Sequence, residues 1–344
     1  MLDNWPQVLL DWFDAHKREL PWRETKPRNP YHVWVSEIML QQTRTEAVKP
    51  YFYSWMNRFP TIHDLAMAEE ADVLHEWQGL GYYSRARNLH KAAKIMEKEY
   101  GATMPHQLEE VKALPGIGDY TAGAICSMAF GQKTAAIDGN VLRVYARLYE
   151  VKEDILKSKG KKDIQQLVAG TLPDRAGDFN EALMDLGATI CIPKHPQCQS
   201  CPLQSFCLAR KHGSEEDLPI RTKKKPQVAY EAACGICMQN GKVLLHKRPK
   251  TGMLASMWEF PMVLASDVPE SQKQLETLLS GQIEQDMWRY THVFTHRIWH
   301  MIAYRMASFK VPEGEYQWFS PEEYKEIPLA GPHAKLAAFL EGRM

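Results

Sequence analysis

The chain has 344 residues with 42 basic and 42 acidic side chains, and 44% of its residues are apolar and 24% charged. This length predicts about two domains, and the ordinary globular composition excludes a disordered polyelectrolyte. No apolar run approaches the roughly 20 residues that a membrane span needs. The N-terminal segment carries Asp3, Asp11 and Asp14 where a secretory signal would be basic and then apolar. We therefore expect a cytoplasmic protein without membrane contact.

Residues 1–212 are expected to form an all-helical domain. Apolar residues recur there at three- and four-residue spacing, which is the period of one helix face, and turns rich in Gly and Pro separate the segments. These segments are Trp5–Phe13, Trp34–Leu40, Val73–Trp77, Leu89–Met96 and Val141–Leu148. No convincing alternating pattern of a strand lies between them.

The composition changes after residue 212. Residues 213–227 are polar and charged, which predicts a solvated linker, and their basic end at Lys223–Lys225 could touch phosphate. Residues 228–344 are expected to form an α+β domain, in which Asn240-Gly241 is a strong hairpin signal. The predicted strands are Tyr230–Met238, Lys242–Lys247 and Arg297–Met306, and the predicted helices are Gln272–Leu279 and His333–Leu340.

Four of the seven cysteines fall within one short stretch, with the spacing Cys-x6-Cys-x2-Cys-x5-Cys. They are Cys191, Cys198, Cys201 and Cys207. In a cytosolic chain such a cluster is more often a metal site than a disulfide framework. Structural zinc sites usually pair two Cys-x2-Cys hooks, and only one is present here. The wide flanking gaps favour a 4Fe–4S cube, but the spacing alone leaves zinc open.

A Gly-x-Gly turn separates a helix that is expected to end near Val111–Ala113 from one that begins at about Asp119. Gly116 and Gly118 allow a tight turn, and N–H groups at the start of the second helix can hold a phosphate oxygen. A lone turn of this kind is usually a plain helix connection. The Leu114-Pro115 lead-in favours a helix-hairpin-helix over residues 108–127, which is a clamp for the DNA backbone.

Two acidic residues are candidates for catalysis. Asp138 follows an apolar triplet and could cap the next helix, but Asn140 is the better-placed cap, which leaves Asp138 free to stabilise a cationic sugar. Glu37 lies among apolar neighbours, and burial would raise the pKa of its carboxyl and suit it to be a general acid. The alternative for Glu37 alone is a partly buried glutamate paired with an arginine.

Together these motifs resemble the MutY family of adenine DNA glycosylases, within the helix-hairpin-helix superfamily, over nearly the whole chain. The motifs that carry the resemblance are Leu20–Arg23, Val35–Thr43, Gly79–Ala86, Leu114–Thr121, Ile137–Val141, Phe179–Gly187 and the four cysteines. The resemblance implies one 4Fe–4S cluster on those cysteines, double-stranded DNA as the partner and a monomeric enzyme.

The resemblance also implies a role for each matching residue. Glu37 is implied to protonate N7 of the adenine and Asp138 to stabilise or trap the C1′ cation, while Tyr120 and Asn140 position Asp138 and the sugar. The residues implied to surround the flipped adenine are Trp22, Arg23 and Glu181, and those implied to wedge into the base stack are Gln42 and Tyr82. Thr43, Leu114, Gly116 and Gly118 complete the expected substrate contacts. Flipping is needed because the glycosidic bond is out of reach inside the duplex.

Position 120 and the second domain refine this prediction. Related endonuclease III enzymes place a lysine at position 120 that cleaves the strand through a Schiff base, and Tyr120 favours a monofunctional enzyme. Met257–Pro261 resembles the Nudix-related domain that reads 8-oxoguanine opposite adenine, without the metal-binding array of a pyrophosphatase. The implied lesion-reading residues are Phe294, Thr295 and His296, with Thr295 where the family usually has serine. We expect removal of adenine opposite 8-oxoguanine or guanine in base excision repair.

Two other functions remain open at this point. One is an oxidised-pyrimidine or thymine glycosylase of the endonuclease III type, against which Tyr120 and the second domain argue. The other is a non-catalytic iron–sulfur DNA-binding protein, against which Glu37 and Asp138 argue.

Overall fold

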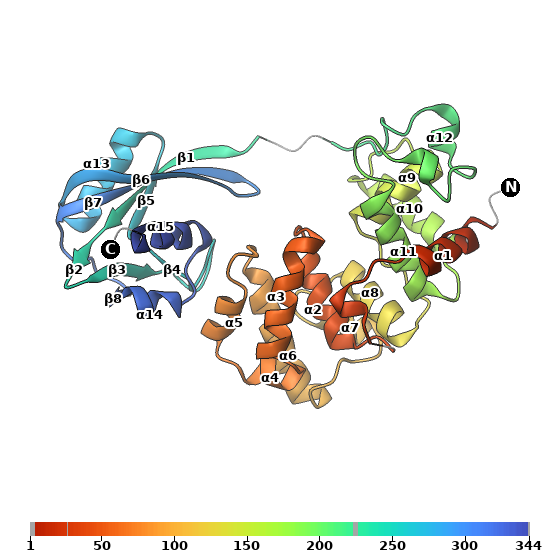
Figure 1. Cartoon of the computed structure of the whole chain (residues 1–344), viewed down its shortest axis with the longest axis horizontal. Coiled ribbons are helices and arrows are strands. Elements are labelled where there is room, and N and C mark those ends of the chain that lie inside the picture. The colour runs from red at the N-terminus through yellow and green to blue at the C-terminus, as the bar shows by residue number, and fades with distance from the viewer. Residues whose placement is uncertain (1–3, 26, 223–225, 343–344) are drawn as a thin grey trace. The chain divides into compact units, whose positions relative to one another are not determined.

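A computed structural model describes residues 4–25, 27–222 and 226–342 of the chain (Figure 1). Its contacts divide the chain into two compact units. The helical unit comprises residues 1–67 and 88–223, and the C-terminal unit comprises residues 224–344 together with residues 68–87. No helix within the described ranges is long and apolar enough to cross a membrane.

Residues up to 212 contain helices and no strand among those described, as predicted. In chain order these are α1 (Trp5–His16), η1 (Pro21–Arg23), α2 (Pro30–Leu40), α3 (Thr45–Arg58), α4 (Ile62–Met67), α5 (Glu70–Glu76), α6 (Ser84–Tyr100), α7 (Leu108–Ala113), α8 (Asp119–Phe130), α9 (Gly139–Leu148), α10 (Ser158–Thr171), α11 (Ala176–Thr189), η2 (Cys198–Ser200) and α12 (Leu208–His212). Each of the five apolar periodic segments coincides with one of these helices.

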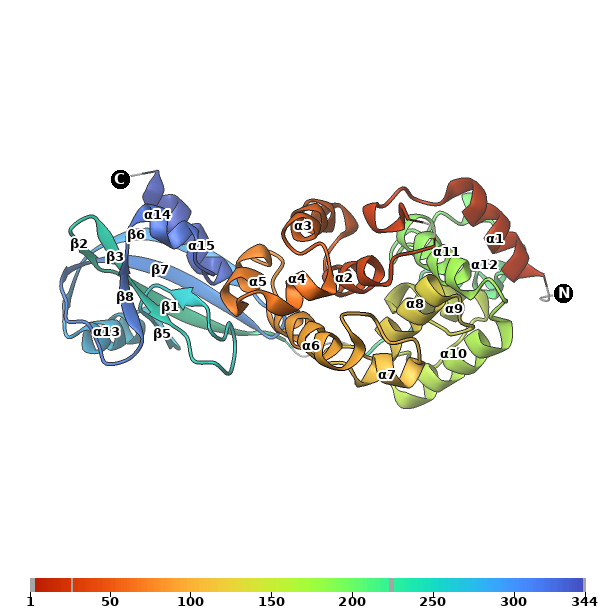
Figure 2. The same ribbon diagram turned by 90° about the horizontal axis from the view of Figure 1, so that it is seen from below.

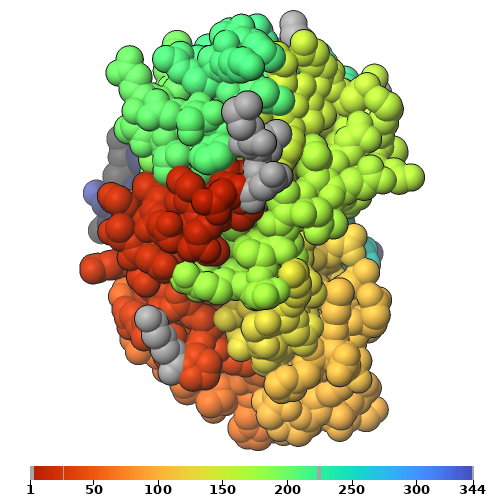
Figure 3. Space-filling view, turned by 90° about the vertical axis from the view of Figure 1, so that its right-hand side faces the viewer, coloured from red at the N-terminus to blue at the C-terminus, as the bar shows by residue number. Residues whose placement is uncertain are grey.

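One core of the helical unit joins the N-terminus to the region around the cysteines. Trp5 of α1 packs against Tyr145 of α9 and Phe179 of α11, with ring centroids 5.6 and 5.4 Å apart. Leu203, between two of the cysteines, belongs to the same buried cluster. Figure 3 shows the red N-terminal helix lying beside the green segment that holds the cysteines. Segments far apart in the sequence therefore pack together and support the part of the helical unit that holds the candidate site.

Helix α2 is buried along most of its length, which explains why it carries few polar residues. Asn29 caps its first turn by accepting hydrogen bonds from the backbone N–H groups of Tyr31 and His32. From Val33 to Met39 every residue of α2 is buried. A glutamate at position 37 is therefore held inside the protein by its helix.

The expected helix-hairpin-helix is present as α7, a short turn and α8. Gly116 has a φ of +81°, and a Cβ there would lie 2.7 Å from Cβ of Asn88, so only glycine fits. Gly118 is the N-cap of α8 and has no neighbouring atom within 4 Å of a Cβ position. The two glycines thus differ, because Gly116 shapes the turn whereas Gly118 leaves open space before the helix.

The C-terminal unit contains two sheets and three helices after residue 226. Their bounds are β1 (Val228–Ile236), β2 (Met238–Gln239), β3 (Lys242–Lys247), β4 (Trp258–Glu259), β5 (Met262–Ala265), α13 (Val268–Leu279), β6 (Gln282–Val293), β7 (Arg297–Ser308), β8 (Tyr316–Phe319), α14 (Pro321–Lys325) and α15 (Gly331–Glu341). One sheet has the order β5-β1-β7-β6, in which only β1 and β7 are parallel, and the other joins β2, β3, β4 and β8.

Helices α13 and α15 cover opposite faces of the sheet β5-β1-β7-β6 (Figure 2). Residues Ala232 and Cys234 of β1 pack into a core with α15, and Ala233 between them packs into a core with α13. This alternation follows from the two-residue period of a strand that is buried on both faces. The predicted α+β organisation is confirmed.

The hairpin prediction needs one correction. Asn240 and Gly241 both have positive φ, as a tight hairpin turn requires. However, the strand that leads into this turn and pairs with β3 is only β2, Met238–Gln239, because β1 ends at Ile236 and belongs to the other sheet. The Asn-Gly signal fixed the turn but could not show that the chain changes sheets just before it.

Residues 218–222 of the expected linker form hydrogen bonds with the helical unit. The carbonyl of Leu218 accepts from Nε of Arg147 at 3.0 Å, the carbonyl of Ile220 accepts from N–H of Ile155 at 3.1 Å, and N–H of Thr222 donates to Asp154 at 2.9 Å. Residues 218–222 are therefore hydrogen bonded to the helical unit, while Ile220, Arg221 and Thr222 remain exposed, as a solvated linker predicts. The basic end at Lys223–Lys225 lies outside the described residues.

Candidate active site

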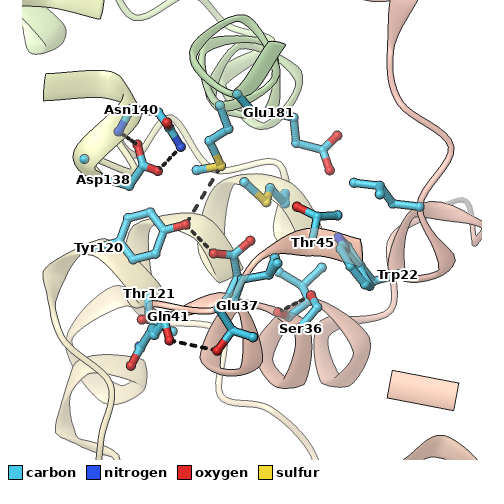
Figure 4. Close-up of a pocket in the computed structure, with 18 of the residues that line it drawn as sticks. Trp22, Ser36, Glu37, Gln41, Thr45, Tyr120, Thr121, Asp138, Asn140 and Glu181 are labelled. Atoms are coloured by element: carbon cyan, nitrogen blue, oxygen red, sulfur yellow. Dashed lines mark hydrogen bonds between the residues drawn. The ribbon is translucent and has the colours of Figure 1, made fainter. Parts of the chain in front are cut away.

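One cavity of about 620 Å³ in the helical unit gathers most of the predicted site residues. Figure 4 shows Glu37 rising from α2 toward Tyr120 of α8, with Asp138 at the start of α9 and Glu181 on α11. The predicted residues that line it are Trp22, Arg23, Glu37, Gln42, Thr43, Gly118, Tyr120, Asp138, Asn140 and Glu181. Five separate segments thus bring the carboxyl groups of Glu37, Asp138 and Glu181 to one cavity.

Glu37 is 5% exposed, as its apolar neighbours predicted. Burial raises the pKa of its carboxyl to about 7, and the nearby charges of Asp138 and Glu181 act in the same direction. The Tyr120 hydroxyl, which donates a hydrogen bond to Glu37 Oε2, and the charge of Arg23 oppose this rise in pKa. A carboxyl with a pKa near 7 can hold and release a proton at neutral pH, which is what a general acid needs.

Asp138 is the N-cap of α9, which corrects the expectation that Asn140 caps this helix. Oδ1 of Asp138 accepts from the backbone N–H groups of Asn140 and Val141, both at 2.8 Å. The Asn140 side chain donates to Oδ2 of Asp138 at 2.7 Å. The cap holds the carboxylate at the cavity wall, so capping and a catalytic role are compatible.

Tyr120 and Asn140 were both expected to position Asp138, but they contact different carboxyl groups. Asn140 contacts Asp138, as expected, but the hydrogen bond of the Tyr120 hydroxyl goes to Glu37. The same hydroxyl lies 3.9 Å from the sulfur of Met184. Burial first, and then the charges of Glu37 and Asp138, hold the pKa of Tyr120 well above its ordinary value, so Tyr120 is a donor here.

An ion-pair network forms the wall around Arg23. Its Nε donates to Glu181 at 2.9 Å and its Nη1 to Asp185 at 2.8 Å, while Nη2 of Arg28 contacts the other oxygen of Glu181 at 3.1 Å. Arg23 therefore pairs with Glu181 and Asp185, and the alternative in which Glu37 is the partner of an arginine is wrong. Trp22 is buried at the same wall.

Arg143 connects the loop that carries Asp138 and Asn140 to the cysteine segment, and this link was not predicted from the sequence. Its Nη2 donates to Oδ1 of Asn140 at 2.8 Å and to the carbonyl of Gly187 at 2.6 Å, and its Nε donates to the carbonyl of Cys191 at 2.7 Å. A Cβ on Gly187 would lie 2.6 Å from Cβ of Asn140, so α11 approaches the loop closely only because of that glycine. The available signal was an arginine one turn after Asn140 on a helix that packs into the core.

The four predicted cysteines line one small cavity in the helical unit. Nη1 of Arg147 lies 3.4 Å from the sulfur of Cys191, and Arg210 lines the same cavity. Burial raises the pKa of the Cys201 thiol to about 12, so a free thiolate is costly there without a cation. Among the described residues, no three cysteine, histidine or acidic side chains come together closely enough to hold a single metal ion.

The predicted DNA-contacting residues of the helical unit differ in exposure. Gln42 has a φ of +61°, a strained value for a residue other than glycine that often marks functional sites. Thr43 lies beside it on the cavity wall. Leu114 is 4% exposed, so its side chain is not available to a ligand.

The implied lesion-reading residues lie together in the C-terminal unit. Phe294, Thr295, His296 and Tyr82 line a cavity of about 520 Å³. Tyr82 is 44% exposed, has a φ of +49°, and its hydroxyl is hydrogen bonded to that of Thr295. Arg85 fixes this turn, because its Nη2 donates to the carbonyls of Leu80 and Gly81 at 3.0 Å each.

The comparisons with known proteins agree with this architecture. Residues 35–170 match the family described as HhH-GPD superfamily base excision DNA repair protein, and residues 232–338 match the NUDIX domain family. A solved structure titled as a thermostable thymine-DNA glycosylase is 27% identical and covers 60% of this chain and 95% of its own, with a TM-score of 0.54. The fold and the buried carboxylates define a DNA glycosylase of base excision repair.

Curated relatives narrow the class further. The adenine DNA glycosylase of Homo sapiens is 34% identical over 97% of this chain and 73% of its own length. That of Buchnera aphidicola subsp. Schizaphis graminum is 31% identical over 96% of both chains. This chain belongs to the family of adenine DNA glycosylases, and the resemblance predicted from its motifs is confirmed.

Proposed function

We propose that this enzyme removes adenine paired with 8-oxoguanine or guanine in duplex DNA, hydrolyses only the glycosidic bond, and leaves an abasic site. The observation that carries the proposal is the pair of buried carboxyl groups, Glu37 and Asp138, in one cavity with a positioned donor, Tyr120. A glycosidic bond to a poor leaving group needs both an acid for the base and a negative charge for the sugar.

In the proposed mechanism the two carboxyl groups act on opposite ends of the breaking bond. Protonated Glu37 gives its proton to a ring nitrogen of adenine, so the bonding electron pair leaves with a neutral base. Asp138 faces the oxocarbenium-like sugar that remains, where its negative charge lowers the energy of the transition state. Water then adds to C1′, and the released proton goes to bulk solvent or to a carboxylate. Tyr120 has no amine, so no Schiff base forms and the strand stays intact.

Recognition of the base is assigned to Glu181 and to the two arginines that contact it, Arg23 and Arg28. Glu181 presents a carboxylate that is held between Arg23 and Arg28, and a carboxylate can accept from the exocyclic amine of adenine but repels the carbonyl of guanine. Trp22 supplies an aromatic surface beside it. These contacts support selection of adenine once the base has been flipped.

DNA contacts are assigned to backbone groups more than to charge, which suits a chain with equal numbers of acidic and basic residues. Open space at Gly118, before the N-terminus of α8, supports a phosphate contact through N–H groups. The strained backbone at Gln42 and at Tyr82 supports their role as wedges in the base stack.

We assign a 4Fe–4S cluster to Cys191, Cys198, Cys201 and Cys207. Four thiols line one cavity and Arg147 donates toward Cys191, and four cysteine thiolates are the ligand set that holds such a cube. When bound, the cluster would cross-link this segment. Anaerobically purified protein should be yellow-brown with about four iron atoms per chain. Stoichiometric zinc without iron would contradict the assignment.

A substrate panel tests the reaction. Duplexes with adenine opposite 8-oxoguanine, adenine opposite guanine, thymine opposite guanine, or thymine glycol are incubated with the enzyme, and strand breaks are measured before and after alkali. We expect breaks only after alkali and only in the adenine duplexes. Cleavage without alkali would contradict the monofunctional mechanism, and release of thymine glycol would contradict adenine recognition.

Lesion reading is tested by a double variant, Thr295→Ala with His296→Ala. A buried polar contact is worth about 1–3 kcal/mol, so the preference for 8-oxoguanine over guanine should fall by roughly ten- to a hundredfold while excision opposite guanine continues. Thr291→Ala, on β6 of the same unit, is the matched control and should keep the preference. An unchanged preference in the double variant would remove these residues from lesion reading.

A further inference from the structure

Asp185 is a buried carboxylate that lies beneath the base pocket without lining it. It follows Glu181 by one turn of α11, and its side chain is 1% exposed. Residues four apart on a helix point to the same side, and of these two carboxylates Glu181 lines the cavity whereas Asp185 does not. A buried charge costs free energy unless it is well paired, so Asp185 needs partners inside the protein.

Asp185 is paired with two arginines from the segment between α1 and α2. Oδ2 and Oδ1 accept from Nη1 and Nη2 of Arg23 at 2.8 and 3.2 Å, which makes a two-pronged contact. Oδ1 also accepts from Nε of Arg18 at 2.7 Å, and Oδ2 from the backbone N–H of Arg18 at 3.2 Å. Both oxygens are thus fully used inside the protein, and neither is available to a substrate.

This contact determines which edge of Arg23 faces the pocket. The guanidinium group is planar, so its Nη edge cannot bind Asp185 in a fork without turning Nε toward Glu181. Nε of Arg23 indeed donates to Oε1 of Glu181 at 2.9 Å. We propose that Asp185 is a positioning residue for adenine recognition, which fixes Arg23 and, through Arg23, the orientation of Glu181. The inference rests on the proposed role of Arg23 and Glu181 around the adenine.

If Asp185 positions Arg23, the loss of Asp185 should also change the pKa of Glu37. The groups that face Glu37 are Tyr120 from α8, Asp138 at the start of α9, Glu181 from α11 and Arg23 from η1. Without the charge of Asp185, the positive charge of Arg23 is balanced by Glu181 alone. Arg23 lowers the pKa of Glu37, so this effect should become stronger and excision should decline at a lower pH.

The test is Asp185→Asn, with Asp178→Asn as the matched control. Asp178 lies on the same helix but forms an exposed ion pair with Arg175 at 2.7 Å. Three quantities are measured: the single-turnover rate of adenine excision, its pH profile, and the affinity for duplex that already contains an abasic site. We expect Asp185→Asn to slow excision about 10- to 100-fold, as misplacement of a binding group does. The alkaline limb of its pH profile, which is the range in which the excision rate falls as Glu37 loses its proton, should shift to lower pH. Affinity for the abasic duplex should stay within about threefold, because no base remains to be positioned.

The control should change none of the three quantities. If Asp185→Asn matches the control, or if the affinity for abasic duplex falls as far as the excision rate, the positioning role is wrong. If Asp185→Asn does not fold, Asp185→Glu takes its place, because it keeps the buried charge but displaces it from Arg23, and it should likewise slow excision. Arg23→Gln provides a second test. If Asp185 acts through Arg23, adding Asp185→Asn to Arg23→Gln should slow excision by less than about threefold more, and a larger additional loss overturns the inference.

Failure of the inference can be told apart from failure of the proposed function. If Arg23→Gln and Glu181→Gln both leave adenine excision unchanged, the base-recognition role of that wall is wrong. If those two variants slow excision and Asp185→Asn does not, only the positioning role of Asp185 is wrong.

Discussion

The hydroxyl of Tyr120 donates a hydrogen bond to Oε2 of Glu37, and it is the largest contribution that opposes the effect of burial on the pKa of this carboxyl. Burial favours the protonated form of Glu37, whereas a donor favours the carboxylate. The balance leaves a pKa of about 7 in a residue whose ordinary value is 4.5. Tyr120 therefore lowers the pKa of Glu37 below the value that burial alone would give, and in the proposed mechanism it tunes the general acid.

Tyr120→Phe should move the alkaline limb of excision to higher pH. Loss of the donor raises the pKa of Glu37, so the carboxyl stays protonated at a pH where the parent enzyme has lost its proton. Single-turnover rates from pH 5 to pH 9 give the comparison. Tyr145→Phe removes a buried hydroxyl that bonds Thr171 in the core and should leave the limb in place. A limb that moves to lower pH in Tyr120→Phe would reverse the assigned role of the hydroxyl.

Glu37→Gln should abolish excision and also stabilise the protein at high pH. General acid catalysis is worth about 10²–10⁴-fold, and glutamine has no proton to give. Folded Glu37 keeps its proton up to about pH 7, but unfolded glutamate loses it near 4.5, so the free energy of unfolding of the parent falls as pH rises between these values. The variant has no carboxyl group at this position, so it does not lose this free energy of unfolding, which amounts to up to about 3 kcal/mol above pH 7.

Thermal unfolding midpoints of Glu37→Gln and the parent, measured at pH 4 and pH 8, test whether the parent loses stability as pH rises. The variant should gain relative to the parent at pH 8 and much less at pH 4, while DNA binding is retained. Equal differences at both values would show that Glu37 titrates normally, and excision within a few-fold of the parent would remove it from the mechanism.

Asp138→Ser separates capping from catalysis. Serine is a good N-cap, so α9 should keep its first turn and the midpoint of unfolding should change little. The negative charge that faces the sugar cation is lost, which should cost roughly 3–4 kcal/mol of transition-state stabilisation, or more than a hundredfold in rate. Asp138→Ala should also lose the cap and about 1 kcal/mol of stability. An active Asp138→Ser enzyme would leave Asp138 with the capping role only.

Gly116→Ala and Gly118→Ala should fail in different ways. A methyl group at position 116 meets Asn88 in a backbone conformation with positive φ, so this variant should lose about 1–3 kcal/mol of stability. At position 118 the methyl group meets no protein atom, so the fold should persist while the added carbon stands where a phosphate approaches. Unfolding midpoints and DNA affinity measured at several salt concentrations distinguish the two. Full DNA affinity in Gly118→Ala would argue against the phosphate contact.

Local patterns in the sequence were sufficient for several features. Period-three and period-four apolar spacing located the helices, since one face of each helix must be buried whatever it packs against. The Gly-x-Gly turn and the Asn240-Gly241 turn were predictable because Gly116, Asn240 and Gly241 have positive φ, which most other residues avoid. The apolar neighbours of Glu37 indicated its burial, and the position of each motif residue indicated the family.

The tertiary structure decided what each polar group contacts. Asp138 rather than Asn140 caps α9, Tyr120 bonds Glu37 rather than Asp138, and Arg23 pairs with Glu181 and Asp185, more than 150 residues away. Hydrogen bonds and ion pairs depend on distances between segments that have no fixed spacing along the chain. The raised pKa of Glu37 has the same origin, because it follows from the residues of four other segments that surround the carboxyl and exclude water from it.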